Sequence, residues 1–277
     1  MPDKVITYNS LKRQGYTGKI FIVCSKDDKA LPEYKTQFGD EVLVFDKNDY
    51  KNEQGYDIFD NNPNEKAVVY ARNACFDLAK QHGIDYFLML DDDYTDFRYK
   101  FNSDLKYSDY TKVKRLDNIF NIFLNFYKSI NCLTMSFSQG GDFIGGKNGS
   151  GAEKIKIKRK AMNTFFCSIH RPFKFTGRIN EDVNMYVSYG IRGHLVFQTN
   201  QFAINQITTQ SNSGGLTDIY LDLGTYVKSF YTVLCAPSCT KIIMVGTEHR
   251  RLHHRISWDN CAVKIISQDY KKTSNGN

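Results

Sequence analysis

The stretch Tyr86-Phe87-Leu88-Met89-Leu90-Asp91-Asp92-Asp93 decides the fold class of this chain. Its apolar half has the length and composition of a strand buried on both faces, which is typical of a parallel sheet in an α/β protein. Three carboxylates follow without a spacer, and like charges so close repel unless a cation or hydrogen-bond donors hold them. Ligands of open α/β sheets usually bind beyond the carboxyl ends of the strands. The stretch therefore predicts a binding site at the end of this strand.

The segments around this stretch alternate between helical and strand patterns. Apolar residues at helical spacing predict helices at residues 5–16, 68–81 and 116–130. Apolar or β-branched runs predict strands at residues 19–24, 41–45 and 132–137. The alternation favours an α/β fold with a central, mostly parallel sheet flanked by helices. Because no repeat or linker interrupts residues 1–277, we expect a single domain.

The composition is that of a folded globular protein, with 41% hydrophobic residues among 277. Seven cysteines are scattered singly, which favours reduced thiols and a cytoplasmic location. No segment approaches the roughly 18 apolar residues of a membrane helix, and Met1–Lys4 is too polar for a secretory signal. We therefore expect no membrane partner. The net charge of +7 favours a polyanionic partner or substrate.

The three consecutive carboxylates have two interpretations. A divalent cation such as Mn²⁺ or Mg²⁺ prefers oxygen ligands, and Asp91 and Asp93 would hold it together with the phosphates of a substrate. The alternative is a solvated acidic turn. Acidic turns are common, but few of them follow an apolar strand directly.

A second acidic pair, Glu181-Asp182, precedes an apolar run with helical spacing. A carboxylate at a helix start is stabilised by the free backbone amides there, whereas a carboxylate in an active site can act as a general base. The residues alone leave both roles open. Between the two side chains, we expect Glu181 to cap the helix and Asp182 to be the base, because the first helical position is well placed for the free amides.

Two basic segments supply further candidates. His253 and His254 lie among arginines, so they are either structural or a source of metal ligands beside phosphate-binding guanidinium groups. In residues 154–160, basic residues alternate with isoleucines, which predicts an edge strand whose charged face contacts DNA phosphates or only protects the edge. The basic residues of this strand are Lys154, Lys156, Lys158, Arg159 and Lys160. No single aromatic ring can be nominated for stacking on a base.

Missing motifs exclude several enzyme classes. The chain has neither a Gly-x-Gly-x-x-Gly fingerprint after its first strand nor a phosphate loop ending in Gly-Lys-Ser/Thr, which removes dehydrogenases and P-loop enzymes. No Gly-x-Ser-x-Gly elbow is present, which weakens an acyl-transfer interpretation.

Short motifs along nearly the whole chain occur in an order that resembles the TET/JBP-associated glycosyltransferases. That family includes phage enzymes and relatives of the base J glucosyltransferase. The motifs are Thr7-Tyr8-Asn9-Ser10-Leu11-Lys12, Gly15-Tyr16-Thr17-Gly18-Lys19, Val44-Phe45-Asp46-Lys47, Tyr70-Ala71-Arg72-Asn73, Leu90-Asp91-Asp92-Asp93-Tyr94, Asn180-Glu181-Asp182-Val183 and His253-His254-Arg255-Ile256-Ser257-Trp258. Each motif alone is weak, and their order is specific.

The resemblance implies a GT-A-like nucleotide-sugar transferase fold. It implies transfer of a sugar, expected to be glucose, from a UDP-sugar to the hydroxymethyl group of hydroxymethyluracil or hydroxymethylcytosine in DNA. Dependence on Mn²⁺ or Mg²⁺ and inversion at the anomeric carbon are further expectations from it. A chain of phage origin would act in the host cytoplasm.

The resemblance also implies roles for individual residues. Asp93 resembles the main metal ligand, Asp91 the carboxylate that faces the donor ribose or the metal, and His253 or His254 a further ligand. The implied donor-binding residues are Asp46, Lys47, Arg72, Asp91 and Asp92. Asp182 is the candidate base, with Glu181 beside it. The family fold has a strand upstream of the helix at residues 5–16, where this chain has only Met1–Lys4, so the sequence leaves open that this strand is missing.

Two other functions remain open. A metal-dependent nucleotidyltransferase would use the same acidic strand end but release pyrophosphate instead of UDP. A non-enzymatic DNA-binding protein would explain the basic charge and would bind DNA without Asp91 and Asp93. Neither accounts for the ordered set of motifs.

Overall fold

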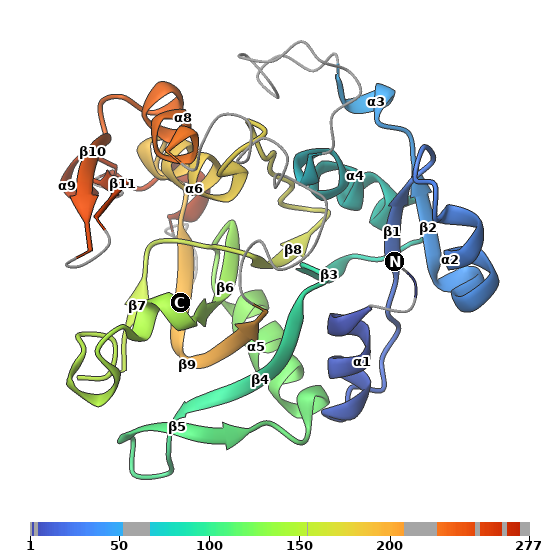
Figure 1. Cartoon of the computed structure of the whole chain (residues 1–277), viewed down its shortest axis with the longest axis horizontal. Helices are drawn as coiled ribbons and strands as arrows, with labels where there is room; N and C mark the ends of the chain where they lie inside the picture. Colours follow the sequence, from blue (N-terminus) through green and yellow to red (C-terminus); the bar gives the residue numbers. More distant parts are fainter. Residues whose placement is uncertain are drawn as a thin grey trace.

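The computed structural model describes residues 2, 5–51, 67–153, 155–207, 226–246, 250–261 and 265–271. In these ranges, helices cover both faces of a seven-stranded sheet (Figure 1). The α-helices are α1 (Ile6–Arg13), α2 (Leu31–Phe38), α3 (Asn48–Lys51), α4 (Val68–Gln81), α5 (Leu116–Ser129), α6 (Glu181–Ile191), α8 (Val227–Cys235) and α9 (Trp258–Cys261). The strands are β1 (Ile22–Ser25), β2 (Val42–Phe45), β3 (Tyr86–Leu90), β4 (Tyr94–Phe101), β5 (Tyr107–Lys112), β6 (Thr134–Gln139), β7 (Ile157–Lys158), β8 (Thr164–Ser168), β9 (Val196–Gln206), β10 (Thr240–Val245) and β11 (Arg251–Ile256).

The large sheet has the strand order β3-β8-β6-β9-β4-β5, and β7 pairs with β9. Within the described ranges its one parallel pairing is β6 with β9, and its other pairings are antiparallel. Strands β1 and β2 form a separate parallel pair, and β10 and β11 form an antiparallel hairpin. The α/β class is confirmed, whereas the mostly parallel central sheet is not. The physical reason is that β8 runs antiparallel between β3 and β6, and β4 runs antiparallel to both β5 and β9.

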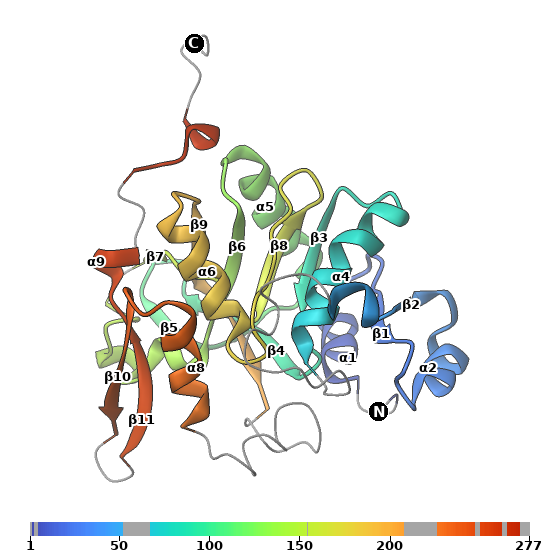
Figure 2. The same cartoon turned by 90° about the horizontal axis from the view of Figure 1, so that it is seen from above.

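Each face of the sheet has its own hydrophobic core. Helices α4 and α6 pack on one face, where Phe165 and Val183 belong to the same buried cluster. Helix α5 packs on the other face, where Phe137, Phe202 and Tyr127 form the second cluster. Figure 2 shows α5 on the side of the sheet opposite to α4 and α6. The two layers explain why β3 is apolar over its whole length, since both faces of the strand are covered.

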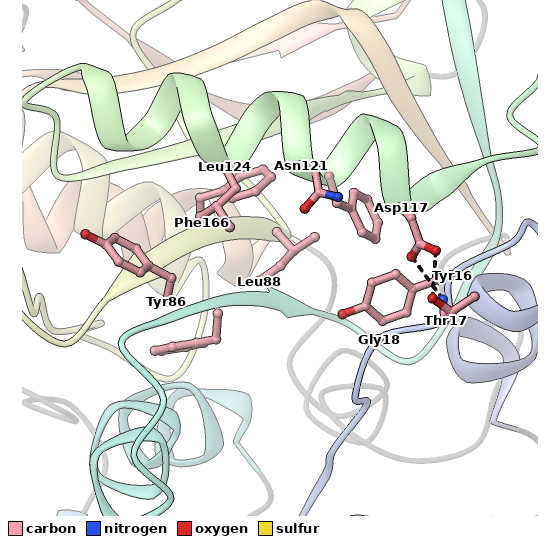
Figure 3. A pocket seen from close by; sticks show the side chains of 11 residues that line it. Tyr16, Thr17, Gly18, Tyr86, Leu88, Asp117, Asn121, Leu124 and Phe166 are labelled. Carbon is pink, nitrogen blue, oxygen red and sulfur yellow. Dashed lines mark hydrogen bonds between the residues drawn. The ribbon is translucent and has the colours of Figure 1, made fainter.

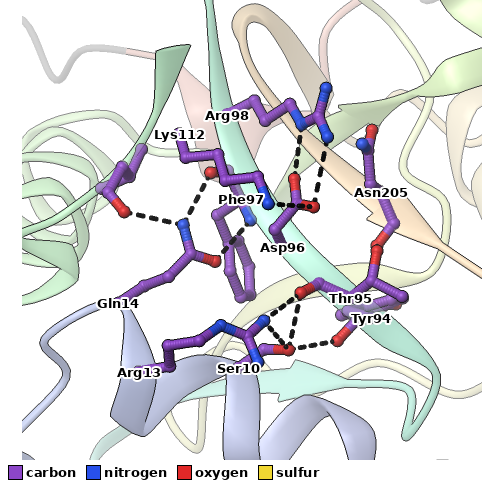
Figure 4. A network of polar contacts seen from close by, with 11 residues as sticks. Ser10, Arg13, Gln14, Tyr94, Thr95, Asp96, Phe97, Arg98, Lys112 and Asn205 are labelled. Atoms are coloured by element: carbon purple, nitrogen blue, oxygen red, sulfur yellow. Dashed lines mark hydrogen bonds and ion pairs between the residues drawn. The ribbon is translucent and has the colours of Figure 1, made fainter. Parts of the chain in front are cut away.

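Helix α1 is held on β4 by hydrogen bonds from side chains to the backbone (Figure 4). The Nε2 atom of Gln14 donates to the carbonyl of Phe97 at 2.9 Å, and the Phe97 amide donates to Oε1 of Gln14 at 2.8 Å. The hydroxyl of Ser10 lies 2.8 Å from the carbonyl oxygens of Tyr94 and Thr95. Both side chains are buried, so these bonds fix the start of β4 directly after the three carboxylates.

The predicted helices at residues 5–16, 68–81 and 116–130 correspond to α1, α4 and α5. The predicted strands at residues 19–24, 41–45, 86–90 and 132–137 correspond to β1, β2, β3 and β6. In the part of the chain that the structure describes, no helix is long and apolar enough to cross a membrane.

Candidate active site

The end of β3 and the start of α6 meet at the guanidinium group of Arg72. Its Nη2 atom lies 2.8 Å from Oδ1 of Asp91, and its Nε atom lies 3.3 Å from Oε1 of Glu181. Arg72 projects from the first half of α4, and its side chain is only 5% exposed. The rings of Phe165 and Phe175 lie 4.9 and 5.3 Å from its Cζ atom. One buried cation therefore joins the two acidic segments that the sequence singles out.

The carboxylates around Arg72 hold their protons more tightly than usual. Burial raises the pKa of Asp91 to about 6, although Arg72 opposes this shift. Burial likewise raises the pKa of Glu181 to about 7, again against the effect of Arg72. The pKa of Asp93 is raised to about 6 by burial and by the charges of Asp91 and Asp92. These carboxylates outnumber the arginine, so the site favours additional positive charge or protons.

The backbone of the acidic segment is fixed by Thr7 in the first turn of α1. The Thr7 hydroxyl donates to the carbonyl of Asp91 at 2.6 Å and accepts from the amide of Tyr94 at 2.9 Å. The Thr7 amide donates to the carbonyl of Asp92 at 3.2 Å. Sequence reasoning gave Thr7 no role, although it begins the first of the ordered motifs. Its position in that motif is the feature of the sequence from which its importance could have been predicted.

The two carboxylates at the start of α6 have different partners. Glu181 carries the ion pair to Arg72, whereas Oδ1 of Asp182 accepts the amide of Val183 at 2.7 Å. The N-cap position belongs to Asn180, whose backbone is left-handed with φ 55°. Its Nδ2 atom donates to the Lys228 carbonyl at 2.6 Å, which ties the start of α6 to α8. Both acidic side chains are buried beside this junction.

The four predicted metal ligands are not brought together. His253 and His254 lie in β11, and burial followed by the charge of His253 lowers the pKa of His254 to about 4. Among the residues that the structure describes, no group of three or more His, Cys, Asp and Glu side chains is placed to hold a metal ion. Within the described residues, the buried Oδ1 atom of Asp93 has no hydrogen-bond partner, so it is available to a cation. A metal here would depend on Asp91, Asp93 and oxygen atoms from the substrate.

The other predicted donor-binding residues lie at the ends of β2 and β3. Asp46 follows β2 and forms an ion pair with Lys26, which follows the parallel strand β1. Oδ1 of Asp46 also accepts the amide of Asn48 at 2.9 Å. Lys47 is half-buried next to Asp46, and the side chain of Asp92 is exposed. Helix α4, which carries Arg72, packs against β1, β2 and β3, so it connects the ends of these strands to Arg72.

The basic segment does not form the expected row of free lysines. Its strand is reduced to Ile157–Lys158, and the isoleucine side chains are the exposed ones, with Ile157 55% exposed. The Nζ atoms of Lys158 and Lys160 lie 2.8 and 2.5 Å from Oδ1 of the buried Asp142. A buried carboxylate needs such counter-charges, which explains why the lysines turn inward.

The remaining predicted DNA-binding residues differ in their surroundings. Lys156 donates to the carbonyl of Ser150 at 2.7 Å, and Arg159 is exposed. Lys154 lies outside the described residues. Among the described residues of this set, Arg159 is the one that is exposed as the sequence predicts.

The comparison with known proteins decides the family. The sequence pattern of the TET-Associated Glycosyltransferase family matches residues 2–215. The chain belongs to this family. No curated protein and no solved structure matches the chain.

The matched region of this glycosyltransferase contains Arg72, Asp91 and Glu181, which together we call the Arg72 cluster. It also contains Thr7, Asp46 and the basic segment at residues 154–160. Helices α8 and α9 and the β10–β11 hairpin follow the matched region. The predicted histidine ligands thus lie outside the part of the chain that carries the family pattern.

A separate cavity of the glycosyltransferase, about 400 Å³ in volume, lies between β3 and α5 (Figure 3). Tyr86, Leu88 and Phe166 line it. Its carboxylate, Asp117, accepts hydrogen bonds from the amide and hydroxyl of Thr17 at 2.9 and 2.8 Å. Because α5 and α4 cover opposite faces of the sheet, this cavity is separate from the Arg72 cluster.

Proposed function

We propose that this glycosyltransferase moves a sugar, glucose in the first instance, from a UDP-sugar to the hydroxymethyl oxygen of a modified pyrimidine in DNA. The family match supports glycosyl transfer and a nucleic-acid acceptor. The single observation that carries the proposal is the buried Arg72 cluster, which gathers the acidic strand end and the acidic helix start at one point. The family match favours transfer over the nucleotidyltransferase and over a DNA-binding protein without catalysis.

A single displacement explains why carboxylates suffice for the chemistry. The hydroxymethyl oxygen attacks the anomeric carbon, the bond from that carbon to the phosphate oxygen breaks, and its electron pair leaves with UDP. The acceptor proton passes to a protein carboxylate. One attack from the side opposite the leaving group inverts the anomeric carbon, and no protein nucleophile is required.

Glu181 is the base that the geometry favours. A base works best when its pKa lies near the working pH, and burial raises the pKa of Glu181 to about 7. The ion pair with Arg72 keeps its carboxylate next to the buried guanidinium group. Asp182, the base that the sequence favours, uses one oxygen for the Val183 amide. We therefore assign the base to Glu181 and a role in positioning the helix start to Asp182.

Asp91 and Asp93 would hold a Mn²⁺ or Mg²⁺ ion that the family resemblance implies. When bound, such an ion neutralises charge on the departing diphosphate. The unpartnered Oδ1 atom of Asp93 supports this assignment. Lys47, at the end of β2, is our candidate for contact with the donor phosphates, and Asp46 for contact with the uridine.

The test is transfer to defined DNA. DNA that contains hydroxymethyluracil or hydroxymethylcytosine is incubated with the protein and single UDP-sugars, digested to nucleosides and analysed by mass spectrometry. We expect one hexose on one hydroxymethylpyrimidine and none in matched DNA that contains thymine or cytosine. The proposal would be overturned if no hydroxymethylpyrimidine nucleoside gained a hexose with any donor, either with or without Mn²⁺.

A further inference from the structure

An open pocket of about 480 Å³ lies between the basic segment and α9. Lys158, Arg159, Lys160, Trp258 and Asp259 line it. Its volume is within the range of about 300 to 1,000 Å³ that is usual for small-molecule sites. Trp258 is the only tryptophan of the chain, and 40% of it is exposed. We call this site the Trp258 pocket.

The Trp258 pocket is linked to the acidic pair through α6. The ring of Trp258 stacks on Tyr186 with the centroids 5.9 Å apart and the planes 16° from parallel. Tyr186 follows Asp182 by four residues in the same helix, so the two side chains share one face about 6 Å apart along the axis. The charges of Asp182 and Asp142 both contribute to the raised pKa of Tyr186, after burial. One helical turn of α6 and the stack of Trp258 on Tyr186 therefore separate the pocket from the acidic pair.

The charges of the pocket are those of an anion site. Its three basic side chains outnumber the two carboxylates near them, Asp259 and the buried Asp142 that Lys158 and Lys160 share. Within the described residues, Arg159 forms no ion pair. An exposed aromatic ring beside a free guanidinium group is the combination that binds a nucleotide, by stacking on the base and pairing with the phosphate.

The hairpin next to the pocket extends the positive surface. Lys241 lies directly opposite Arg255, and Arg251 lies on the same face of the hairpin. All three side chains are exposed, and in the described part of the chain none of them forms an ion pair. Like charges directly opposite each other destabilise a strand pair, and a bound polyanion removes that cost. Figures 1 and 2 place this hairpin and α9 together on one side of the molecule.

We propose that the Trp258 pocket binds a nucleotide of the acceptor DNA strand next to the target nucleotide. The base of that neighbour stacks on the free face of Trp258, Arg159 binds its phosphate, and Lys241, Arg251 and Arg255 bind the phosphates beyond it. The pocket binds the neighbouring nucleotide and not the target nucleotide, because a helical turn and a ring stack separate the pocket from Glu181 and Asp182. This inference rests on the proposed function, since it requires DNA as the acceptor.

The single tryptophan makes the inference directly measurable. The full-length protein is titrated with a short unmodified single-stranded oligonucleotide, and tryptophan emission is followed beside the anisotropy of a labelled copy. We expect saturable quenching with the same dissociation constant as the anisotropy change. UDP alone should leave the emission unchanged.

Variants separate stacking from charge. Trp258→Ala should weaken oligonucleotide binding by about 5- to 150-fold, whereas Trp258→Phe should restore most of it, because every base can stack on either ring. Arg159→Ser should reduce the slope of log affinity against log salt by about one. The matched control is Lys35→Ser in α2, on the far side of the molecule (Figure 1), which should leave that slope unchanged. Equal melting temperatures confirm that each variant is folded.

Three outcomes would overturn the inference. In the first, the oligonucleotide binds by anisotropy, but the tryptophan emission does not change and Trp258→Ala binds with normal affinity. This result would place the DNA elsewhere on the protein and leave the proposed function intact. Quenching by UDP alone would assign the pocket to the donor. Absence of both DNA binding and transfer in the wild type would remove the proposed function together with the inference.

Discussion

The Nη2 atom of Arg72 lies 2.8 Å from Oδ1 of Asp91, and its Nε atom reaches Glu181, so one buried guanidinium group balances charge from two distant segments. A buried ion pair that loses one partner leaves an uncompensated charge, which is much more costly than the loss of an exposed pair. Arg72 therefore connects the stability of the fold to the chemistry of the site.

The first prediction concerns stability without Arg72. Arg72→Met should lower the free energy of unfolding at pH 7.5 by about 3 to 5 kcal/mol, because Asp91 and Glu181 lose their cation. The loss should be smaller at pH 5.5, where these carboxyls, with pKa values of about 6 and 7 beside Arg72, are largely protonated. Urea unfolding at both pH values measures the difference. An equal loss at both would show that Arg72 acts by packing alone.

The second prediction concerns the pH dependence of stability at Asp93. Its pKa in the folded protein is raised to about 6, so the folded state binds the proton more tightly than the unfolded state does. Stability due to this group is present below pH 4 and is lost as pH rises through 6. Asp93→Asn should therefore be about 1 kcal/mol more stable than wild type at pH 7, after allowance for partial exposure, and no more stable at pH 4. A gain at pH 4 equal to that at pH 7 would contradict the assigned charge.

The third prediction concerns the cation. Titration calorimetry of Mn²⁺ in the presence of UDP should show weaker binding in Asp93→Asn, because the unpartnered Oδ1 atom of Asp93 is our candidate ligand. His254→Ala should bind Mn²⁺ as wild type does, since β11 is not placed with the carboxylates. Equal affinity in Asp93→Asn would remove Asp93 from the proposed cation site. Weaker binding in His254→Ala would return the histidine to the ligand set, as the sequence predicts.

The fourth prediction concerns Thr7. Thr7→Val removes the hydroxyl that bonds the Asp91 carbonyl and the Tyr94 amide, and an unmade buried hydrogen bond costs about 1 to 3 kcal/mol. Thr7→Ser keeps the hydroxyl and is the matched control. Chemical unfolding of the two variants should differ by most of that amount, and equal stability would remove Thr7 from its proposed role.

The sequence predicts the local elements better than their pairing. The apolar periodicity of α4 and the uniform apolar run of β3 identify both elements, because each depends on neighbours in sequence. Strand β9 carries Gln198, Thr199 and Asn200 as buried residues, so its pattern resembles a polar loop. Strand order depends on contacts between distant segments, which periodicity does not encode.

In the candidate site, too, the sequence predicts local features better than contacts between distant segments. The sequence identifies Asp91 and Glu181, because charged residues next to apolar elements are conspicuous, whereas Arg72 is implied only by the family resemblance. It does not reveal that the lysines of residues 154–160 turn toward Asp142, since that partner comes from a glycine-rich segment with no charge pattern of its own. Nor does it reveal the stack of Trp258 on Tyr186, which only the packing of α9 on α6 creates.

The most direct test of the central claim is the rate of sugar transfer to hydroxymethylated DNA in Glu181→Gln, with Asp182→Asn and wild type measured alongside by nucleoside mass spectrometry. Loss of a general base typically slows proton transfer by about 100- to 10,000-fold. We expect that loss in Glu181→Gln at an unchanged affinity for UDP, and a much smaller loss in Asp182→Asn. Wild-type turnover in a folded Glu181→Gln, together with an inactive Asp182→Asn, would contradict the account and return the base to Asp182.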